Sequence, residues 1–553
     1  MVEVLPFMSM TTTDRPLSEA VAHLDDLAVG SMKMVKVDGH RICLVRTSED
    51  VFALDNACPH QGYGLTQGYL TSDLLTCEWH NWKFRVTDGA CVVGEENVQT
   101  HEVQVEPDGS LFVVIRARSA DERRPELLAS LRRGIERDYI GQVARDTVRL
   151  LRSSTNPGEL VWEAVAWGVP RAEFGWGHSV ASATDCLTAL DLFEGDERAL
   201  PIVQAIAGIS ETERDRPVNP LPTPLSSLPA HAAAEFRAAV EAEQLDDAQA
   251  LVLTAVEAGA DADMLRPWFT TVVCDHHLSY GHGAIYTHKA FQLLDHIGWE
   301  RAAAVLPYLV PSLIYGTRED KLPYMKPFMR ALGYLDLLAL TTIAPDFGWD
   351  GRAGLVDALL GADKRAPLAA AALALHQGAG VSGLLDAVVV AVSERMLRYD
   401  ATGEQDLSDD FGWLDITHGL TYANATRWHA AHQPGPDTLR LALFACFLAH
   451  YTGRHEWHTT VGPRHDVDRP SNESTRYGEA AVRASMLDTS GAFIVQAHAI
   501  KTSRAAWEES VRIGSIAPLD AAWRFMHAPR QDRFVASAVQ QSIDFLSGRV
   551  ARD

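Results

Sequence analysis

Cysteine is scarce in this sequence. The chain has 553 residues and only seven cysteines, which are Cys43, Cys58, Cys77, Cys91, Cys186, Cys274 and Cys446. Small proteins held together by disulfides are short chains with many regularly spaced cysteines, so this composition excludes that class. Some of the few cysteines are therefore expected to bind metal.

Positive charge and long apolar runs are also in short supply. Lys and Arg total 49 against 73 Asp and Glu, a net charge of −24. Such a charge repels nucleic-acid phosphates and anionic lipids, and it suits a basic docking patch on a protein partner. No apolar run approaches the ~20 residues that cross a bilayer, and the first residues lack the pattern of a signal peptide. We therefore expect a cytoplasmic protein with no nucleic-acid or membrane partner.

Apolar residues are plentiful enough for a large core. They make up 47% of the chain against 22% charged residues, which is typical of soluble globular proteins. At about 150 residues per domain, the length allows three or four domains.

Residues 14–118 predict a small antiparallel β domain, preceded by a tail at residues 1–13. Short strand-like runs such as MKMVKV, RICLVRT and SLFVVIR recur along this segment. Asp38-Gly39, Asp88-Gly89 and Asp108-Gly109 lie between such runs, and Asp-Gly is typical of hairpin turns. We expect a barrel or sandwich of roughly 100 residues.

The composition changes at a charged segment that ends in Pro125, and residues 119–553 predict a large all-α domain. This part is rich in Ala and Leu, with apolar residues at helical spacing, as in GLLDAVVVAVSERMLRY. Residues 216–229 contain five prolines, which cannot continue a helix, and are expected to form a surface loop rather than a second boundary.

The β domain contains two Cys-His pairs. Cys58 is followed by His60 at Cys-x-His spacing, and Cys77 by His80 at Cys-x-x-His spacing. A [2Fe-2S] cluster with two thiolates on one iron and two imidazoles on the other needs such mixed pairs on two loops. A tetrahedral zinc site is the alternative, although zinc fingers usually place both cysteines in one half and both histidines in the other.

Residues 28–115 resemble Rieske proteins, on these four ligands together with Trp79, Trp82, Phe84 and Asp88-Gly89. The resemblance implies a [2Fe-2S] cluster bound by Cys58, His60, Cys77 and His80, and one-electron transfer. The extra cysteines of the high-potential Rieske proteins of respiratory complexes are missing from both loops. The match is therefore to Rieske ferredoxins and to the Rieske domains of oxygenases, and a lone domain of this kind could equally be an electron shuttle.

Four histidines recur beside small residues in the helical part. They are His178, His282, His418 and His498, and the segments His282-Gly-x-x-Tyr and His418-Gly-x-x-Tyr are alike. Small neighbours let helices approach closely, and histidines from facing helices can converge on a metal in a bundle. Buried histidines that each bond to a backbone carbonyl are the alternative.

This recurrence resembles the questin oxidase-like family, helical enzymes of aromatic polyketide metabolism. The resemblance rests on the four histidine segments and His277, and it implies a histidine-rich non-haem Fe(II) site that oxygenates or cleaves polycyclic quinones. In some members a carboxylated lysine joins the histidines. Lys501, one turn after His498, is close enough in sequence to approach the same site, although the sequence does not align it with that lysine.

Two further residues are candidates for the helical site. Rieske oxygenases normally hold their iron with an Asp-x-x-His-x(3–4)-His segment, and the nearest match here, around His277 and His282, has Asp275 at the wrong spacing. Asp415 lies three residues before His418, so on a helix the two share a face. We expect His277 and Asp415 to support the ligands or substitute for them, with a solvated or helix-capping Asp415 as the alternative.

These observations predict an oxygenase in which the Rieske cluster passes single electrons to a non-haem iron that activates O2 against an apolar, aromatic or polyketide-like substrate. Residues 378–383 match a dinucleotide-binding string but follow helical sequence, so electrons are expected from an external reductase or ferredoxin. The alternatives are a Rieske electron-transfer protein whose helical domain is a docking module without a second metal, and a hydrolase or isomerase with a structural cluster. The sequence makes no prediction of oligomeric state.

Overall fold

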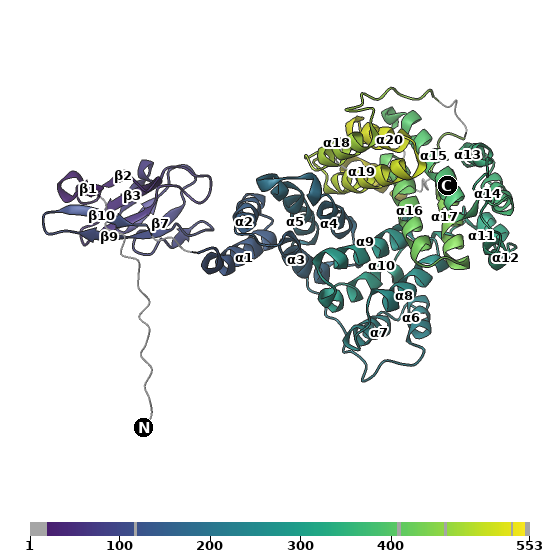
Figure 1. Ribbon diagram of the computed structural model, residues 1–553, viewed down its shortest axis with the longest axis horizontal. Coiled ribbons are helices and arrows are strands. Elements are labelled where there is room, and N and C mark those ends of the chain that lie inside the picture. The colour runs from purple at the N-terminus through teal and green to yellow at the C-terminus, as the bar shows by residue number, and fades with distance from the viewer. Residues whose placement is uncertain (1–18, 116–118, 406–410, 458–461, 532–534, 548–553) are drawn as a thin grey trace. The chain divides into compact units, whose positions relative to one another are not determined.

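The computed structural model describes residues 19–115, 119–405, 411–457, 462–531 and 535–547 (Figure 1). The chain divides into two units, residues 1–130 and residues 131–553, and the division falls inside helix α1 (Ala120–Glu136). The predicted tail at residues 1–13 and the predicted boundary after residue 118 lie outside the described residues.

The N-terminal unit contains a six-stranded antiparallel sheet. Its strands run in the order β1-β10-β9-β4-β3-β2, with β1 (Ala22–His23), β2 (Met32–Val37), β3 (His40–Arg46), β4 (Val51–Asp55), β9 (Thr100–Val105) and β10 (Ser110–Val114). Strands β2 and β3 form a hairpin in which Val37 pairs with His40. Asp38 and Gly39 both have positive φ angles, of 46° and 83°, as a two-residue hairpin turn requires.

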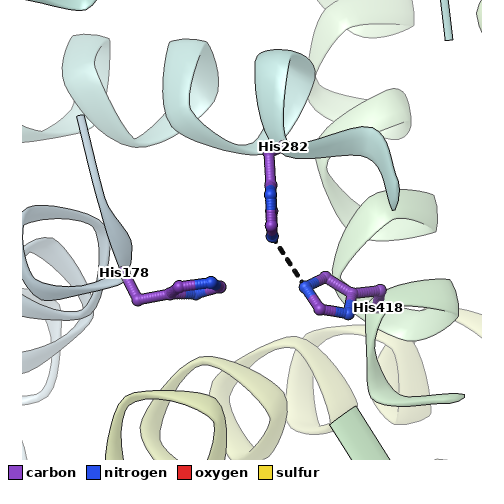
Figure 2. A group of neighbouring side chains, drawn as sticks. All are labelled: His178, His282 and His418. Atoms are coloured by element: carbon purple, nitrogen blue, oxygen red, sulfur yellow. Dashed lines mark hydrogen bonds between the residues drawn. The ribbon is translucent and has the colours of Figure 1, made fainter. Parts of the chain in front are cut away.

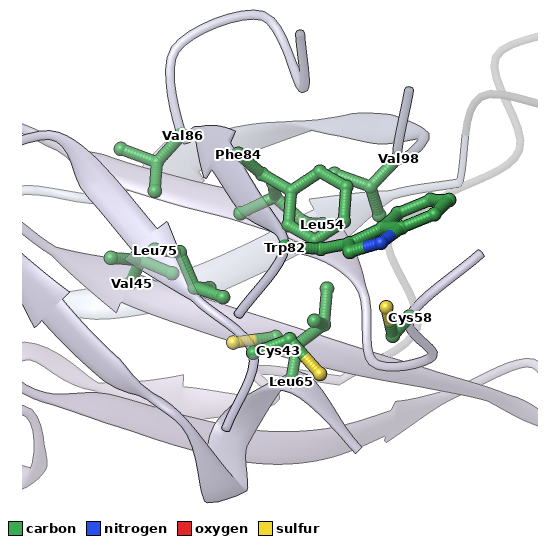
Figure 3. Packing of buried hydrophobic residues seen from close by; sticks show 11 residues of the cluster. Cys43, Val45, Leu54, Cys58, Leu65, Leu75, Trp82, Phe84, Val86 and Val98 are labelled. Atoms are coloured by element: carbon green, nitrogen blue, oxygen red, sulfur yellow. The ribbon is translucent and has the colours of Figure 1, made fainter. Parts of the chain in front are cut away.

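A second, four-stranded sheet follows the order β5-β6-β7-β8, with β5 (Tyr69–Thr71), β6 (Leu74–Thr76), β7 (Lys83–Arg85) and β8 (Cys91–Val93). The loop after β4 carries Cys58 and His60, and the loop between β6 and β7 carries Cys77 and His80. One hydrophobic cluster lies under both loops (Figure 3), and it consists of Cys43, Val45, Leu54, Cys58, Leu65, Leu75, Cys77, Trp82, Phe84, Val86 and Val98. This shared core fixes the two loops against one another.

The C-terminal unit is helical. Its first helices are α2 (Ile140–Arg152), α3 (Pro157–Gly168), α4 (His178–Thr188), α5 (Ala199–Glu213), α6 (Ala232–Glu241), α7 (Leu245–Glu257), α8 (Ala262–Asp275), α9 (His282–Ile297), α10 (Val310–Ile314), α11 (Lys326–Leu332) and α12 (Leu337–Thr341). They are followed by α13 (Arg352–Leu360), α14 (Ala366–His376), α15 (Gly380–Arg398), α16 (Trp413–His432), α17 (Pro436–Tyr451), α18 (Ser474–Ser485), α19 (Phe493–Ile513), α20 (Ala517–His527) and α21 (Val535–Leu546). The predicted fold class, a small antiparallel β domain before a large helical region, is confirmed.

Four of these helices form a closed ring: α4 packs on α9, α9 on α16, α16 on α19 and α19 on α4. Buried residues cover most of the length of α16 and α19. A helix that is buried on nearly all sides belongs to the interior of a large unit rather than to its surface. The ring therefore brings together helix faces that are far apart in the sequence.

The segments between helices agree with their sequence signals. The proline-rich residues 216–229 lie between α5 and α6 without helix or strand, and residues 377–379 form the turn between α14 and α15. Within the described ranges, no helix is both long enough and apolar enough to cross a membrane.

Candidate metal centres

Cys58 and Cys77 begin two loops that share one pattern of backbone hydrogen bonds. In each loop the cysteine N–H donates to the carbonyl oxygen five residues further on, at 2.8 Å in both cases. The cysteine carbonyl oxygen accepts from the N–H four residues further on, at 2.7 Å in the first loop and 3.0 Å in the second. That fourth residue, Gly62 or Asn81, has a positive φ angle. The two loops thus present their cysteine and histidine in matched geometry.

The side chains of the two loops meet. Nδ1 of His60 lies 2.9 Å from Nδ1 of His80, and the His60 ring stacks on Trp82 with centroids 4.9 Å apart. The Cys58 thiol faces the Cys77 thiol, and burial raises the pKa of Cys58 to about 12. A buried thiol loses its proton readily only when a cation such as a metal ion replaces that proton on the sulfur. Two facing thiols beside two facing imidazoles fit the mixed ligand set of a [2Fe-2S] cluster.

The ring of four helices encloses the four recurrent histidines. His178 and His282 are the first residues of α4 and α9, and His418 and His498 lie in the second turns of α16 and α19. Ligand atoms of His178, His282 and His418 lie within 4.8 Å of one another, and their rings point to a common centre (Figure 2). The His498 ring centroid lies 4.5 Å from that of His178 and 4.8 Å from that of His418.

Hydrogen bonds to the backbone fix which ring nitrogen carries the proton in two of these histidines. Nδ1 of His418 lies 2.5 Å from the Leu414 carbonyl oxygen, and Nδ1 of His498 lies 2.7 Å from that of Ile494. A carbonyl only accepts, so Nδ1 must donate and Nε2 is left as a bare lone pair. The two Nε2 atoms nevertheless lie 3.2 Å apart, and Nε2 of His282 lies 2.7 Å from that of His418. Lone pairs at this separation fit a shared metal cation.

The imidazoles are held in the neutral form that binds metals. Burial lowers the pKa of His418 to about 3, and it lowers the pKa of His178, His282 and His498 well below the usual value. His418 and His498 are buried, whereas His178 and His282 are half-buried. The accessible side of the group is therefore the side of His178 and His282.

Lys501 joins the same group. Its Nζ lies 2.5 Å from Nδ1 of His178, and burial lowers its pKa to about 7. A lysine with such a pKa is about half neutral near pH 7, and its neutral form has a free lone pair for chemistry. The structure thus brings together His178, His282, His418, His498 and Lys501.

Comparison with known proteins identifies the N-terminal unit. Residues 18–106 match the Rieske [2Fe-2S] domain. The ferredoxin component of the naphthalene 1,2-dioxygenase system of Pseudomonas putida is 32% identical over 90 residues, which are 16% of this chain and 86% of the ferredoxin. The N-terminal unit belongs to the Rieske [2Fe-2S] family.

Two further similarities involve Rieske ferredoxins. The ferredoxin component of the alkene monooxygenase system of Xanthobacter autotrophicus is 40% identical over 70 residues, and this chain spans just over half of it, 57%, with 12% of its own length. The ferredoxin of carbazole 1,9a-dioxygenase from Nocardioides aromaticivorans IC177 is a solved structure with 27% identity and a TM-score of 0.17, covering 18% of this chain and 97% of the ferredoxin. Each similarity thus covers less than a fifth of the chain.

His277 and Asp415 stand apart from the converging imidazoles. His277 is fully buried, and its Nε2 lies 2.8 Å from Oε2 of Glu319. Asp415 accepts a hydrogen bond from the Gly412 N–H at 3.0 Å, which caps the start of α16, and it pairs with Arg454 at 3.3 Å. Both residues therefore act on the surroundings of the imidazole group, and Asp415 takes the capping role that was the alternative.

A strained segment leads into His282. Ser279, Tyr280 and Gly281 have consecutive positive φ angles of 45°, 57° and 89°. The left-handed conformation costs roughly 1–2 kcal/mol for each residue with a Cβ. Hydrogen bonds offset this cost: the Ser279 N–H donates to the Thr317 carbonyl at 3.0 Å, and the Tyr280 N–H donates to Oε2 of Glu319 at 3.1 Å. As a result the Tyr280 ring lies over His418, with centroids 5.5 Å apart.

A buried ion pair beside the imidazole group was not predicted. Nζ of Lys289 donates to Oδ1 of Asp185 at 2.8 Å, and both side chains are buried. Asp185 lies seven residues after His178, and Lys289 lies seven residues after His282. Seven residues are about two helical turns, so this repeated spacing is a sequence signal that could have identified the pair.

Proposed function

We propose that the chain is a Rieske-dependent non-haem iron oxygenase that acts on an apolar, aromatic or polyketide-like small molecule. The observation that carries this proposal is the convergence of four imidazoles on a common centre, two of them with unprotonated Nε2 atoms facing each other. Four neutral imidazoles without a cation would leave buried lone pairs unsatisfied, each at a cost of about 1–3 kcal/mol. One metal ion satisfies them together.

Each ligand set suits its own metal group. Cys58, His60, Cys77 and His80 would hold the [2Fe-2S] cluster, because mixed thiolate and imidazole ligation defines the Rieske type. The four histidines of the helical unit would hold Fe(II), since imidazole is a ligand that iron favours. Iron(II) with an open position supplies O2 activation, and a Rieske cluster supplies single electrons.

The chain's own residues shape the site around the iron position. Tyr286 stacks on the His282 ring with centroids 5.0 Å apart, and Tyr280 covers His418. These rings exclude water from part of the imidazole group, in which His178 and His282 remain half-buried. A flat, apolar substrate matches such aromatic walls.

Lys501 completes the proposed site. Its amine lies against His178, where it can hold or release a proton, or its neutral form can combine with CO2 as the carboxylated lysine of the resembling family does. His277 and Asp415 position the surroundings through Glu319 and Arg454.

The electron donor would be an external reductase or ferredoxin. The relatives described above are ferredoxin components of oxygenase systems. The same relatives favour a second candidate, a Rieske electron-transfer protein whose helical unit is a docking module without a second metal. The two candidates differ in the iron content of the chain.

Metal analysis of anaerobically purified full-length protein tests the choice. A cluster alone gives two irons per chain, the oxygenase gives three, and four would indicate a dinuclear centre. His418→Gln should lower the count by one while the Rieske absorption remains. The matched control is His429→Gln, a buried histidine three turns further along α16 whose ring bonds to Thr270 and to the Ala284 carbonyl. Two irons in both wild type and control would refute the oxygenase.

A further inference from the structure

The helical unit contains a line of aromatic side chains that begins at the proposed iron site. Its first member is Tyr280, whose ring lies over His418 at 5.5 Å with an interplanar angle of 30°. The strained left-handed segment that holds Tyr280 there is otherwise unfavourable for a residue with a Cβ. Strain of this kind persists where the surroundings enforce it, and here Glu319 and Thr317 do so.

The Tyr280 hydroxyl has a proton acceptor. It donates a hydrogen bond to the Asp415 carboxylate, which in turn lies 3.3 Å from Arg454. Tyr286 also stacks on a histidine of the site, but no carboxylate of the described residues acts on its hydroxyl. The two tyrosines therefore differ in whether the hydroxyl has a proton acceptor. This difference matters for oxidation, because a phenol that loses an electron must also release its proton.

The line continues from Tyr280 through two further tyrosines to Trp457. The Glu319 carboxylate accepts from the Tyr280 N–H and from the Tyr324 hydroxyl, so the two residues meet at one side chain. Tyr324 stacks on Tyr451 with centroids 4.3 Å apart and an interplanar angle of 9°. Tyr451 lies 6.3 Å from Trp457, and Tyr324, Tyr451 and Trp457 are all half-buried.

We propose that Tyr280, Tyr324, Tyr451 and Trp457 form a one-electron relay that removes oxidising equivalents from the iron site when O2 reacts in the absence of substrate. This proposal rests on the proposed function. Tyrosine and tryptophan lose electrons but do not readily accept them, so the relay carries an oxidising equivalent outward and does not deliver the cluster's electrons inward.

The steps balance. Tyr280 gives one electron to the oxidised iron and its phenolic proton to Asp415, which leaves a neutral tyrosyl radical. An electron from Tyr324 reduces the Tyr280 radical, whose proton returns from Asp415, while the Tyr324 hydroxyl passes its own proton to Glu319. Tyr451 then reduces Tyr324, whose proton returns from Glu319, and Trp457 reduces Tyr451. The half-buried Tyr451 and Trp457 release their protons to solvent and take them back from it. At the half-buried Trp457, a soluble thiol supplies the last electron and loses its proton, and two thiyl radicals combine to a disulfide.

Freeze-quench electron paramagnetic resonance tests the relay on the full-length protein. The Rieske cluster is kept oxidised, in which state it is silent, the helical site is loaded with Fe(II), and O2 is added without substrate or thiol. A transient tyrosyl signal that narrows on ring deuteration of tyrosine is expected. Tyr280→Phe should abolish the early signal, and Asp415→Asn should lower its yield several-fold, whereas Tyr286→Phe should retain it.

A second measurement follows the path outward. Tyr451→Phe should prolong the Tyr280 radical several-fold, and peptide mass spectrometry after repeated exposure to O2 should find oxidation of Tyr451 and Trp457 in wild type but not in Tyr280→Phe. An unchanged signal in Tyr280→Phe, or oxidation of bound Fe(II) without any radical, overturns the relay and leaves the oxygenase standing. A chain that binds no iron beyond the cluster overturns both.

Discussion

Gly281→Ala should destabilise the helical unit strongly. Gly281 has a φ angle of +89°, and an added Cβ would lie 2.5 Å and 2.9 Å from two ring atoms of Tyr422 and closer still to a third. Tyr422 is 1% exposed and belongs to α16, so its ring has no free space to move into. The left-handed backbone and the overpacking together should lower the free energy of unfolding by about 2–5 kcal/mol. Because His282 follows directly, iron occupancy of the proposed site should fall too.

Urea unfolding of the full-length protein, followed by far-UV circular dichroism, measures this effect because the helical unit dominates the signal. Gly354→Ala is the matched control: Gly354 lies exposed within α13, and a Cβ added there would have no atom within 4 Å. That substitution should stabilise the protein by about 0.4–1 kcal/mol, because alanine lowers the conformational entropy of the unfolded chain. If Gly281→Ala were within about 0.5 kcal/mol of wild type, a typical surface effect, the strained geometry at this position would be wrong.

Three other sites allow equally direct tests. His60→Ala should abolish the Rieske absorption bands while the far-UV helical signal stays, and surviving bands would show that His60 is not a ligand. Lys289→Met should lower the free energy of unfolding by about 3–5 kcal/mol because it leaves the Asp185 charge buried, and adding Asp185→Leu should recover most of the loss in the same urea assay. Burial lowers the pKa of His429 to about 4. As the pH drops below 6.5, the unfolded state therefore binds a proton before the folded state does, and the free energy of unfolding decreases. Urea unfolding measured between pH 7 and pH 4 gives the free energy of unfolding as a function of pH. Its slope should be smaller by about 1.4 kcal/mol per pH unit in His429→Gln than in wild type, and equal slopes would contradict the lowered pKa of His429.

The sequence predicted the parts of the fold that depend on local signals. The hairpin at Asp38 and Gly39 follows from the need for two positive φ angles, and the run MKMVKV coincides with β2. Strands β1, β5 and β8 were not predicted, because two or three residues are too few to show alternation. Residues 232–259 have apolar residues at helical spacing throughout, as one continuous helix would. The structure instead divides them into α6 and α7 at Glu243, whose positive φ angle has no signal in its residue type.

The two candidate metal centres differed in how much the sequence could predict. Each Cys-His pair of the Rieske domain lies within one loop, so residue types and spacing carry most of the information. The histidines of the helical unit come from four helices spread over more than 300 residues, and their assignment as ligands stays a prediction. The sequence places Tyr280 close to His282, but the stacking of its ring on His418 could not be predicted, since it depends on hydrogen bonds to Thr317 and Glu319, which are distant in sequence.

The charged pair beside the imidazoles explains how helices α4 and α9 keep their register. Asp185 and Lys289 lie seven residues beyond His178 and His282. The alignment of the two helices that forms the ion pair is therefore the same one that places the two imidazoles side by side. A slip of one turn, about 5.4 Å, would separate Lys289 from Asp185 and leave buried charges unpaired, at a cost of about 3–5 kcal/mol. The same slip would carry His282 away from His178. The chain's own charges therefore hold the imidazoles in register, and a metal ion that binds there does not have to align the helices by itself.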